Sequence, residues 1–308
     1  MRFNKLDLNL LVALDALLNE QNVSRAAELV HVSQSTMSHT LARLREHFND
    51  ELLMQVGRGM ELTPRGELLR DPIRDILVRI ASTVDSQPRF DPTIEEREFV
   101  LHLSDYSMEV LLPHVFALCA QRGSRVRFRL LPQAGNPARL LERGEVDMLI
   151  IPQPFCSAEH PLQALFVESL VALMWSQSRL AKATLTLEEY KSARHVVMHP
   201  IGTDRPAYDG WLMEQLQIAR DVGVATYCFT PIPEMLVGTE MLATVHARLA
   251  RRATRHLPLQ IAPLPFEMPT LSQAMQWHKH RSRDPALTWL RELIAEASQR
   301  VDEPAAPA

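Results

Sequence analysis

The sequence predicts an α/β multidomain protein in which a helical N-terminal region and one long helix precede a larger α/β region. Three observations lead to this prediction. Near the N-terminus, a short alanine-rich helix and a serine-capped helix are separated by the three-residue break His31-Val32-Ser33. A glycine-centred hairpin and a long helical stretch come next. Beyond residue 93, strands alternate with helices, which favours a sheet of the parallel type.

The bulk composition is that of a soluble globular protein, with 46% hydrophobic and 23% charged residues. No apolar run reaches the ~18 residues of a membrane span, and the N-terminus does not resemble a signal peptide. The three cysteines are scattered, so we expect reduced thiols in the cytoplasm and neither a cofactor nor a metal. The net charge of −4 does not indicate a nucleic-acid binder. Phosphate contact depends, however, on where the arginines lie rather than on the charge sum.

The first 50 residues predict three helices. In the first, Leu10, Leu14 and Leu17 share one face. Ser24 is the expected N-cap of a short second helix, and Ser33 is the expected N-cap of a third helix over residues 34–48. The third helix turns an apolar stripe inward, made of Met37, Leu41, Leu44 and Phe48.

The opposite face of the third helix carries small polar side chains suited to a DNA major groove. Gln34 can pair with adenine, and Arg43 can contact guanine or a phosphate. The remaining candidates on or beside this face are Ser35, Thr36, Ser38 and His39. A lone capped amphipathic helix would more often be a solvated surface helix. The order of short helix, break, capped helix, hairpin and long helix favours a DNA-reading winged helix-turn-helix instead.

The hairpin and the long helix complete this region. Extended runs at 52–56 and 60–62 flank Gly57-Arg58-Gly59, and Thr63-Pro64 then begins a helix that runs to about residue 86. Its stripe of Leu69, Ile73, Ile76 and Ile80 suits pairing with another helix, the alternative being an ordinary core helix. Pro72 should kink this helix or mark a break in it.

Residues 87–92 form the expected domain boundary, after which elements of the α/β region follow. Strands are expected at 99–103, 126–131, 148–151, 166–175, 195–198, 222–229, 242–245, 260–264 and 271–277, and helices at 108–121, 137–143, 208–216 and 285–300. Residues 302–308 are an expected disordered tail. The basic cluster from Arg248 to His256 has two open interpretations, a solvated helix face or a contact with protein or phosphate.

The N-terminal 63 residues resemble the DNA-binding domain of the LysR family of bacterial transcription regulators. The matching motifs are Ser24-Arg25-Ala26-Ala27-Glu28-Leu29, Val32-Ser33-Gln34-Ser35-Thr36-Met37-Ser38, Leu41-Ala42-Arg43-Leu44-Arg45 and Leu62-Thr63-Pro64-Arg65-Gly66. The α/β region is similar to the sensor domain of the branch that regulates nodulation and aromatic catabolism. The matching motifs there are Gly144-Glu145-Val146-Asp147-Met148-Leu149-Ile150, Ala243-Thr244-Val245 and Asp284-Pro285-Ala286-Leu287-Thr288-Trp289-Leu290-Arg291.

The resemblance implies a division of the chain and a set of DNA contacts. A winged helix-turn-helix would span 1–63, a linker and dimerisation helix 64–87, and a two-lobed, periplasmic-binding-protein-like effector domain 93–301, with lobe I at 93–165 and 268–301 and lobe II at 166–267. The third-helix residues and Ser24 would contact DNA, and Arg58 would enter the minor groove as the wing. Gln55 stands where the family usually has arginine, which leaves Arg58 as the only basic residue of the wing.

The effector site should lie between the two lobes, where helix N-termini and strand ends meet. Lobe I would contribute Ser104, Asp105, Tyr106 and Ser107 at a strand end, together with Pro152 and Gln153 at the crossover. Lobe II would contribute His199, Gly202, Thr203 and Phe229. The alternative for Ser104 or Ser107 is a simple helix N-cap.

The resemblance implies a homodimer or homotetramer that binds promoter DNA, responds to a small aromatic inducer and engages RNA polymerase as an activator. A repressor, or a regulator responding to a non-aromatic metabolite, is the alternative. Phosphate-binding glycine loops and the G-x-S-x-G elbow are missing from the sequence, which argues against an enzyme. His278 and His280 lack partners with ligand-like spacing, so no metal site is expected.

Overall fold

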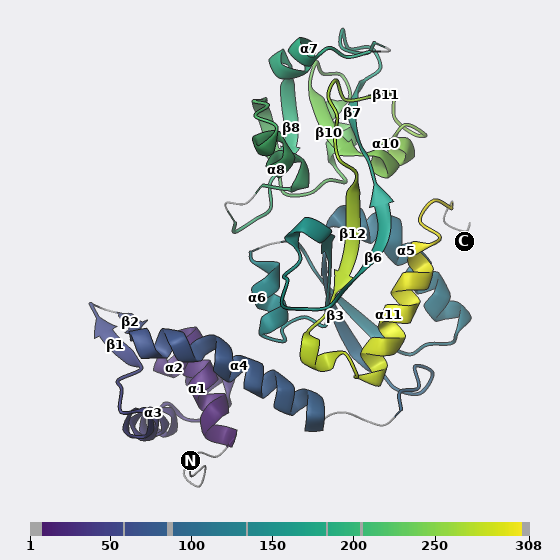
Figure 1. Ribbon diagram of the computed structural model, residues 1–308. Coiled ribbons are helices and arrows are strands. Elements are labelled where there is room, and N and C mark those ends of the chain that lie inside the picture. The colour runs from purple at the N-terminus through teal and green to yellow at the C-terminus, as the bar shows by residue number, and fades with distance from the viewer. Residues whose placement is uncertain are drawn as a thin grey trace. The chain divides into compact units, whose positions relative to one another are not determined.

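The computed structural model describes residues 8–57, 59–84, 89–133, 135–182, 184–203 and 206–303, apart from the side chain at position 82. The chain forms two compact units (Figure 1). One comprises residues 1–86 with 142–144, and the other comprises the rest of the chain. No helix among the described residues is long and apolar enough to cross a membrane.

The N-terminal unit contains three helices, a hairpin and a long helix, in the predicted order. They are α1 (Leu8–Glu20), α2 (Val23–Leu29), α3 (Gln34–Phe48), β1 (Leu53–Val56), β2 (Gly59–Leu62) and α4 (Pro64–Val84). The two strands are antiparallel, with Leu53 opposite Leu62 and Val56 opposite Gly59. Apolar faces of α1, α2 and α3 share one core with Leu52, Leu53 and Ile73. The predicted winged helix-turn-helix is confirmed.

The caps of the short helices differ from prediction at one position. Ser33 caps α3 as expected, accepting a hydrogen bond from the Thr36 amide at 3.1 Å. Ser24, however, does not cap α2. Asn22 is the N-cap, and its side-chain oxygen accepts from the amides of Ser24 and Arg25 at 2.9 and 3.0 Å. Ser24 therefore lies within the first turn of the helix, beyond the position where a capping side chain is needed.

Helix α4 runs without interruption through Pro72, so the predicted break is not found. Its apolar stripe is used unevenly. Ile73 is buried in the N-terminal core, and Leu69 packs partly against it. Ile76, by contrast, is 43% exposed. The core-helix alternative therefore holds for the first half of the stripe, and apolar surface remains on the second half.

The C-terminal unit contains two five-stranded sheets, which define two lobes. The first-lobe sheet has the order β4-β3-β5-β12-β6, and the second-lobe sheet has the order β11-β7-β10-β8-β9. In the first lobe the strands are β3 (Glu98–Leu103), β4 (Arg127–Leu131), β5 (Met148–Pro152), β6 (Leu162–Glu168) and β12 (Leu271–Gln276). In the second they are β7 (Leu170–Trp175), β8 (Arg194–Met198), β9 (Asp221–Thr226), β10 (Leu242–His246) and β11 (Leu259–Ala262).

Both sheets are mixed, which corrects the expectation of a parallel type. β3 pairs in parallel with β4 and β5, but β12 is antiparallel to β5 and β6. In the second sheet β7 is antiparallel to β10 and β11. The chain leaves the first sheet along β6 and returns along β12, which lies beside it (Figure 1). A returning strand must run opposite to the strand that left, and this gives each sheet its antiparallel part.

The crossover point lies between β6 and β7. The sequence predicted a single strand over 166–175, but the structure has two strands, one in each sheet, separated by Ser169. The first sheet therefore extends to Glu168 rather than to the expected lobe boundary at 165. Only Ser169 separates the two strands, and apolar residues lie on both sides of it, so the apolar pattern alone does not reveal the change of sheet.

Helices flank both sheets. The first lobe has α5 (Asp105–Gln121), α6 (Pro137–Glu142) and α11 (Pro285–Ser298), with the single-turn helices η1 (Gln153–Phe155) and η2 (Lys279–Arg281). The second has α7 (Leu187–Ser192), α8 (Tyr208–Gln215), α9 (Ile232–Leu236) and α10 (Ala247–Ala253). Helices α7 and α9, of six and five residues, were not predicted, whereas α10 covers part of the Arg248–His256 stretch for which a helix face was one interpretation. Helix α5 starts three residues before the expected Met108, because Ser104 caps it.

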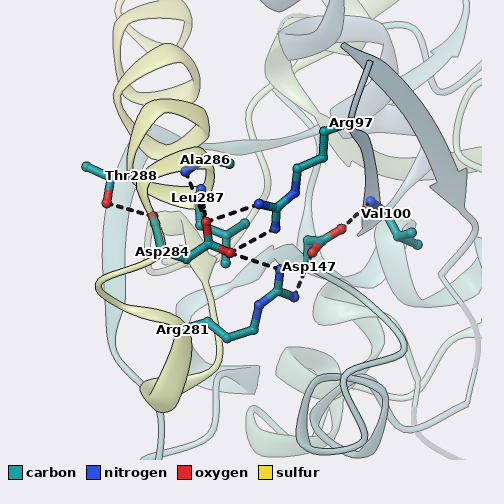
Figure 2. Close-up of polar contacts among 8 residues, drawn as sticks. All are labelled: Arg97, Val100, Asp147, Arg281, Asp284, Ala286, Leu287 and Thr288. Atoms are coloured by element: carbon teal, nitrogen blue, oxygen red, sulfur yellow. Dashed lines mark hydrogen bonds and ion pairs between the residues drawn. The ribbon is translucent and has the colours of Figure 1, made fainter. Parts of the chain in front are cut away.

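The two family-like motifs of the first lobe meet in one polar network (Figure 2). Asp284 caps α11, and its carboxylate accepts hydrogen bonds from Nη1 and Nη2 of Arg97, at 3.1 and 2.8 Å. Arg281 pairs with Asp147 at 2.7 Å and with Asp284 at 3.4 Å. Asp147 also accepts from the Val100 amide at 2.7 Å. These motifs therefore hold β3, β5 and α11 together.

The C-terminal segment is better ordered than predicted. Asp302, expected in a disordered tail, receives two hydrogen bonds of 2.8 Å from Arg248. Residues 304–308 lie outside the described part of the chain. His278 is the N-cap of η2, and His280 lies within it. In the described residues, no group of three or more His, Cys, Asp or Glu side chains is placed to hold a metal ion.

The Asp284 network gives a testable pH dependence. Burial would raise the pKa of Asp284, but the hydrogen bonds and charge of Arg97, with the charge of Arg281, lower it below its ordinary value. Asp284→Asn keeps the cap but removes the charge, and should reduce the free energy of unfolding by about 1–3 kcal/mol at pH 7. A carboxylate whose pKa is lower in the folded state stabilises the fold at pH values above its unfolded-state pKa, and this stabilisation is lost as the pH falls through the folded-state pKa. The melting temperatures of the wild type and Asp284→Asn should therefore converge below about pH 4. A difference in melting temperature that stays constant with pH would contradict this role of Asp284.

Candidate DNA-reading face and effector site

Helix α3 is buried on one side only. Met37, Leu41 and Leu44 are at most 4% exposed and pack against α1 and α2. The candidate DNA contacts on the other side are all exposed, namely Gln34, Ser35, Thr36, Ser38, His39 and Arg43. The sequence-based prediction of a free polar face on this helix is confirmed, and we call these six residues the α3 face.

The start of the α3 face is organised by its cap. The Ser33 hydroxyl lies 2.9 Å from that of Ser35 and 2.8 Å from that of Thr36. Each hydroxyl has one donor and two acceptor sites, so these contacts leave capacity for a base or phosphate. Free amide groups at a helix N-terminus add a preference for anions such as phosphate. The hydroxyls of Ser35 and Thr36 and the backbone amides of the first turn are thus held together at the start of α3.

The arginines of this region differ in their engagement. Arg45 donates to the carbonyls of Glu51 and Leu53, at 2.9 and 2.7 Å, and ties α3 to the base of the hairpin. Arg25 pairs with Glu20 at 3.0 Å. Within the described part of the chain, no hydrogen bond or ion pair engages Arg43. Arg43 is therefore available for DNA, whereas Arg45 has a structural role.

The other two predicted DNA contacts are placed less fully. Ser24 is half-buried in the first turn of α2 and donates its amide to Asn22. Arg58 lies outside the described residues, so its predicted role as the wing contact is not tested. Gln55 is exposed on β1, so its side chain faces solvent on the wing.

A buried polar cluster lies at the N-terminus of α5. Ser104 accepts from the Ser107 amide at 3.1 Å, and the two hydroxyls are 3.1 Å apart. Gln273 on β12 donates to the Ser107 hydroxyl at 3.2 Å and is itself only 2% exposed. Among the described residues, the side-chain amide oxygen of Gln273 (Oε1) has no hydrogen-bond donor. A buried acceptor without a donor costs about 1–3 kcal/mol, so a ligand donor here would gain binding energy.

Gln273 was missed by sequence reasoning. It lies in a predicted strand, and nothing in its sequence neighbourhood marks it. The structure places it opposite Pro152 on β5. Ser104, Ser107, Pro152 and Gln273 therefore gather where the two lobes are joined, and we call them the Ser104 cluster.

Asp105, Tyr106 and Phe229 are placed differently from expectation. Asp105 crosses to the second lobe, accepting from the amide and hydroxyl of Thr230 at 2.7 and 2.8 Å. Tyr106 is fully buried and stacks on His246 at 3.7 Å, with its hydroxyl donating to Glu168. Phe229 meets the same His246 ring edge-on at 4.8 Å. Tyr106 and Phe229 are thus core residues here, because aromatic stacking has buried them.

Burial fixes the protonation of this core. It raises the pKa of Tyr106, with the charge of Glu168 acting in the same direction. It also lowers the pKa of His246 to about 3. The phenol therefore remains a donor to Glu168, and the imidazole is neutral at physiological pH.

The remaining expected ligand contacts lie at the surface. His199 and Gln153 are exposed, and Gly202 has a φ of +71° that favours glycine. His199 also borders a cavity of about 550 Å³ lined by Met213, Arg220 and others between α8 and the sheet. Next to Gly202, Ile201 accepts from the Gly135 amide of the first lobe at 3.1 Å. Thr203, two residues after Ile201, is half-buried.

Comparison with known proteins agrees with these features. Residues 8–67 match the model for bacterial regulatory helix-turn-helix proteins of the lysR family, and residues 94–299 match the LysR substrate binding domain. The chain belongs to the LysR family. It is a ligand-responsive, DNA-binding transcription regulator by class and not an enzyme.

Full-length relatives share much of the sequence. Nodulation protein D of Bradyrhizobium sp. (strain ANU 289) is 40% identical over 304 residues, covering 98% of this chain and 90% of the relative. Nodulation protein D 1 of Mesorhizobium japonicum is also 40% identical, covering 99% and 97%. These identities span both units.

Solved structures show the same fold. A probable transcriptional regulator, PA0477 of Pseudomonas aeruginosa, matches with a TM-score of 0.64 and 27% identity, covering 96% of this chain and 98% of that one. A full-length OxyR variant of the same organism, with one cysteine replaced, matches with a TM-score of 0.69 at 19% identity, covering 96% and 95%. CbnR in complex with its target DNA matches with a TM-score of 0.51 at 17% identity, covering 97% and 100%.

The unengaged arginine of the α3 face allows a direct test. Arg43→Ala should weaken binding to a duplex that the wild-type protein selects from a random library, by about 5- to 100-fold, because one base or phosphate contact is lost. Binding is measured by fluorescence anisotropy at several salt concentrations. Arg179→Ala, which removes an 81% exposed arginine of the second lobe, is the matched control. Equal affinities for the two variants would exclude the role of Arg43.

Proposed function

We propose that this chain is a transcription activator of a nearby operon, induced by a small aromatic compound such as a phenol, a chlorinated aromatic, a salicylate-like acid or a flavonoid. The exposed α3 face is the observation that carries the DNA-binding part. The resemblance to nodulation protein D relatives supports the aromatic class of inducer. The protein acts in the cytoplasm, where promoter DNA lies.

DNA reading requires two copies. The α3 face of each copy enters one major groove, with Gln34, the serine and threonine hydroxyls and Arg43 as contacts. Arg58 is the proposed contact to the adjacent minor groove. Helix α4 supports pairing through Ile76, which the chain itself leaves exposed. A homodimer, or a tetramer of two such dimers, then fixes the half-site spacing.

The Ser104 cluster is the proposed centre of the inducer site. It combines the N-terminus of a 17-residue helix with two hydroxyls and the unpaired Gln273 oxygen. A phenolic hydroxyl can donate to Gln273, and a carboxylate or phenolate can accept from Ser104, Ser107 and the free amides. His199, Gly202 and Thr203 would face this cluster from the second lobe.

Inducer binding then acts as a population shift. The ligand favours one arrangement of the lobes because it contacts both of them, and it can shift the equilibrium only by this difference in affinity. The altered arrangement changes the angle between linked dimers and relaxes a DNA bend, which lets RNA polymerase engage the promoter.

A ligand screen of the full-length protein tests the inducer class. Phenol, chlorophenols, salicylate and naringenin are added separately, with aliphatic dicarboxylates as the contrasting set. An aromatic inducer at a hundredfold excess over its dissociation constant stabilises the protein by about 2.7 kcal/mol, which is visible as a raised melting temperature. Stabilisation by the aliphatic acids alone would replace the aromatic class with a non-aromatic metabolite.

The Ser104 cluster gives a further prediction. Ser104→Ala should raise the half-maximal inducer concentration of an operator-linked reporter at least tenfold, because a direct ligand donor is lost. It also removes an N-cap worth about 1 kcal/mol, and Thr186→Ala, which uncaps α7, controls for that loss. Operator affinity without inducer should not change in either variant. An identical inducer response in both variants would discard the Ser104 cluster as the site.

A further inference from the structure

Arg248 on α10 connects three segments of the effector domain. Its Nη1 donates to the Val167 carbonyl at 2.8 Å and to the Glu168 carboxylate at 3.1 Å. Its Nε and Nη2 each donate to one carboxylate oxygen of Asp302, both at 2.8 Å. Helix α10 belongs to the second lobe, whereas Val167 and Glu168 end β6 and Asp302 follows α11 in the first. We call these four residues the Arg248 clamp.

The inner half of the Arg248 clamp is buried. The Glu168 side chain is 1% exposed and that of Arg248 is 12% exposed. Glu168 also accepts the Tyr106 hydroxyl and the Ser169 amide, the latter at 2.8 Å. An arginine removed from this position would leave a buried carboxylate uncompensated, which is strongly destabilising. The inner half is therefore a fixed anchor.

The outer half is accessible. Asp302 is 69% exposed, and its two parallel hydrogen bonds form a bidentate pair with the guanidinium. The clamp borders a cavity of about 520 Å³, which both lobes line. Loss of the Asp302 charge would leave Arg248 bound to Glu168, so the outer half can weaken without exposing an unpaired buried charge.

A second arginine of α10 reinforces the connection. Arg252, one turn after Arg248, donates to the Glu109 carbonyl of α5 at 2.7 Å. Arg251, Arg255 and His256 are at the surface instead. The basic cluster of the sequence is thus divided, since two arginines bind the first lobe and the other cations form a solvated face.

The position of the Arg248 clamp links it to lobe rotation. The chain changes sheets at Ser169, directly after the two β6 residues that Arg248 contacts. Rotation of one lobe against the other pivots at such crossover segments. Movement of α10 relative to the first lobe would lengthen the bonds to Asp302 and to Glu109.

We propose that the Arg248 clamp stabilises the present arrangement of the two lobes against rotation of one lobe relative to the other, and that Asp302 sets its strength. The regulatory consequence rests on the proposed function, because it requires that lobe arrangement controls transcription. Arg248 and Asp302 are then positioning residues. They do not touch the inducer, and they set how much binding energy the inducer must supply to shift the population.

Two readouts test this with Asp302→Asn in the full-length protein, neither of which needs an inducer. Hydrogen–deuterium exchange should become at least threefold faster in peptides covering α10 and the segment from Thr230 to Leu236. Expression of an operator-linked reporter without inducer should differ from the wild-type level by about threefold, as expected for an exposed ion pair of up to about 1 kcal/mol. Asp302→Glu keeps the charge and should restore wild-type expression.

The matched control is Asp221→Asn, which removes a 63% exposed carboxylate paired with Arg194 inside the second lobe. Exchange rates equal to those of this control would overturn the clamp. Faster exchange with unchanged reporter expression would overturn its regulatory role. Wild-type protein that never binds DNA would instead refute the proposed function, and the exchange experiment would still decide whether the lobes are clamped.

Arg248→Lys is the second variant. It keeps the ion pair with Glu168 but loses the bidentate hydrogen bonds to Asp302, so its exchange rates and reporter expression should match those of Asp302→Asn.

Discussion

One-sided burial of α3 is the constraint on which the DNA-binding account depends. Met37, Leu41 and Leu44 fill the core between α1 and α2, which fixes the rotation of α3 about its axis. With the rotation fixed, the short polar side chains can only point outward. The Ser33 cap holds the first turn and orients two hydroxyls at its start. Arg45 donates hydrogen bonds from the same helix to the base of the hairpin, which fixes the wing relative to α3.

In the effector domain, the corresponding constraint is the double passage of the chain between the sheets. Leaving along β6 and returning along β12 forces antiparallel strands into each sheet and leaves two narrow connections between the lobes. Polar side chains gather at this junction from both directions. In the Ser104 cluster, the side-chain oxygen of Gln273 has no hydrogen-bond donor among the described residues. In the Arg248 clamp, the guanidinium donates its hydrogen bonds to other groups of the protein. The Ser104 cluster and the Arg248 clamp therefore lie within a few residues of the same crossover.

Sequence reasoning predicted the N-terminal unit almost completely, because caps, glycines and helical periodicity are local signals. It placed the cap of α2 at Ser24, which is wrong. Asn22, two residues earlier, is an equally good capping residue, so the sequence alone does not decide between the two. In the effector domain it found most strands, but not the change of sheet at Ser169, because only this residue separates β6 from β7 and apolar residues lie on both sides of it. Gln273 and Thr230 acquire their roles only through contacts across more than 100 residues of chain, as the bonds to Ser107 and Asp105 show. The stacking of Tyr106 on His246 could not be predicted for the same reason, since His246 lies in the other lobe.

The most direct measurement of the central claim is a structure of the full-length chain bound to a duplex that it selects from a random library. The account predicts two copies whose α3 helices lie in successive major grooves, with Gln34 or Arg43 hydrogen-bonded to base edges. A complex in which α3 faces solvent or another protein surface, while a different element contacts the bases, would contradict it.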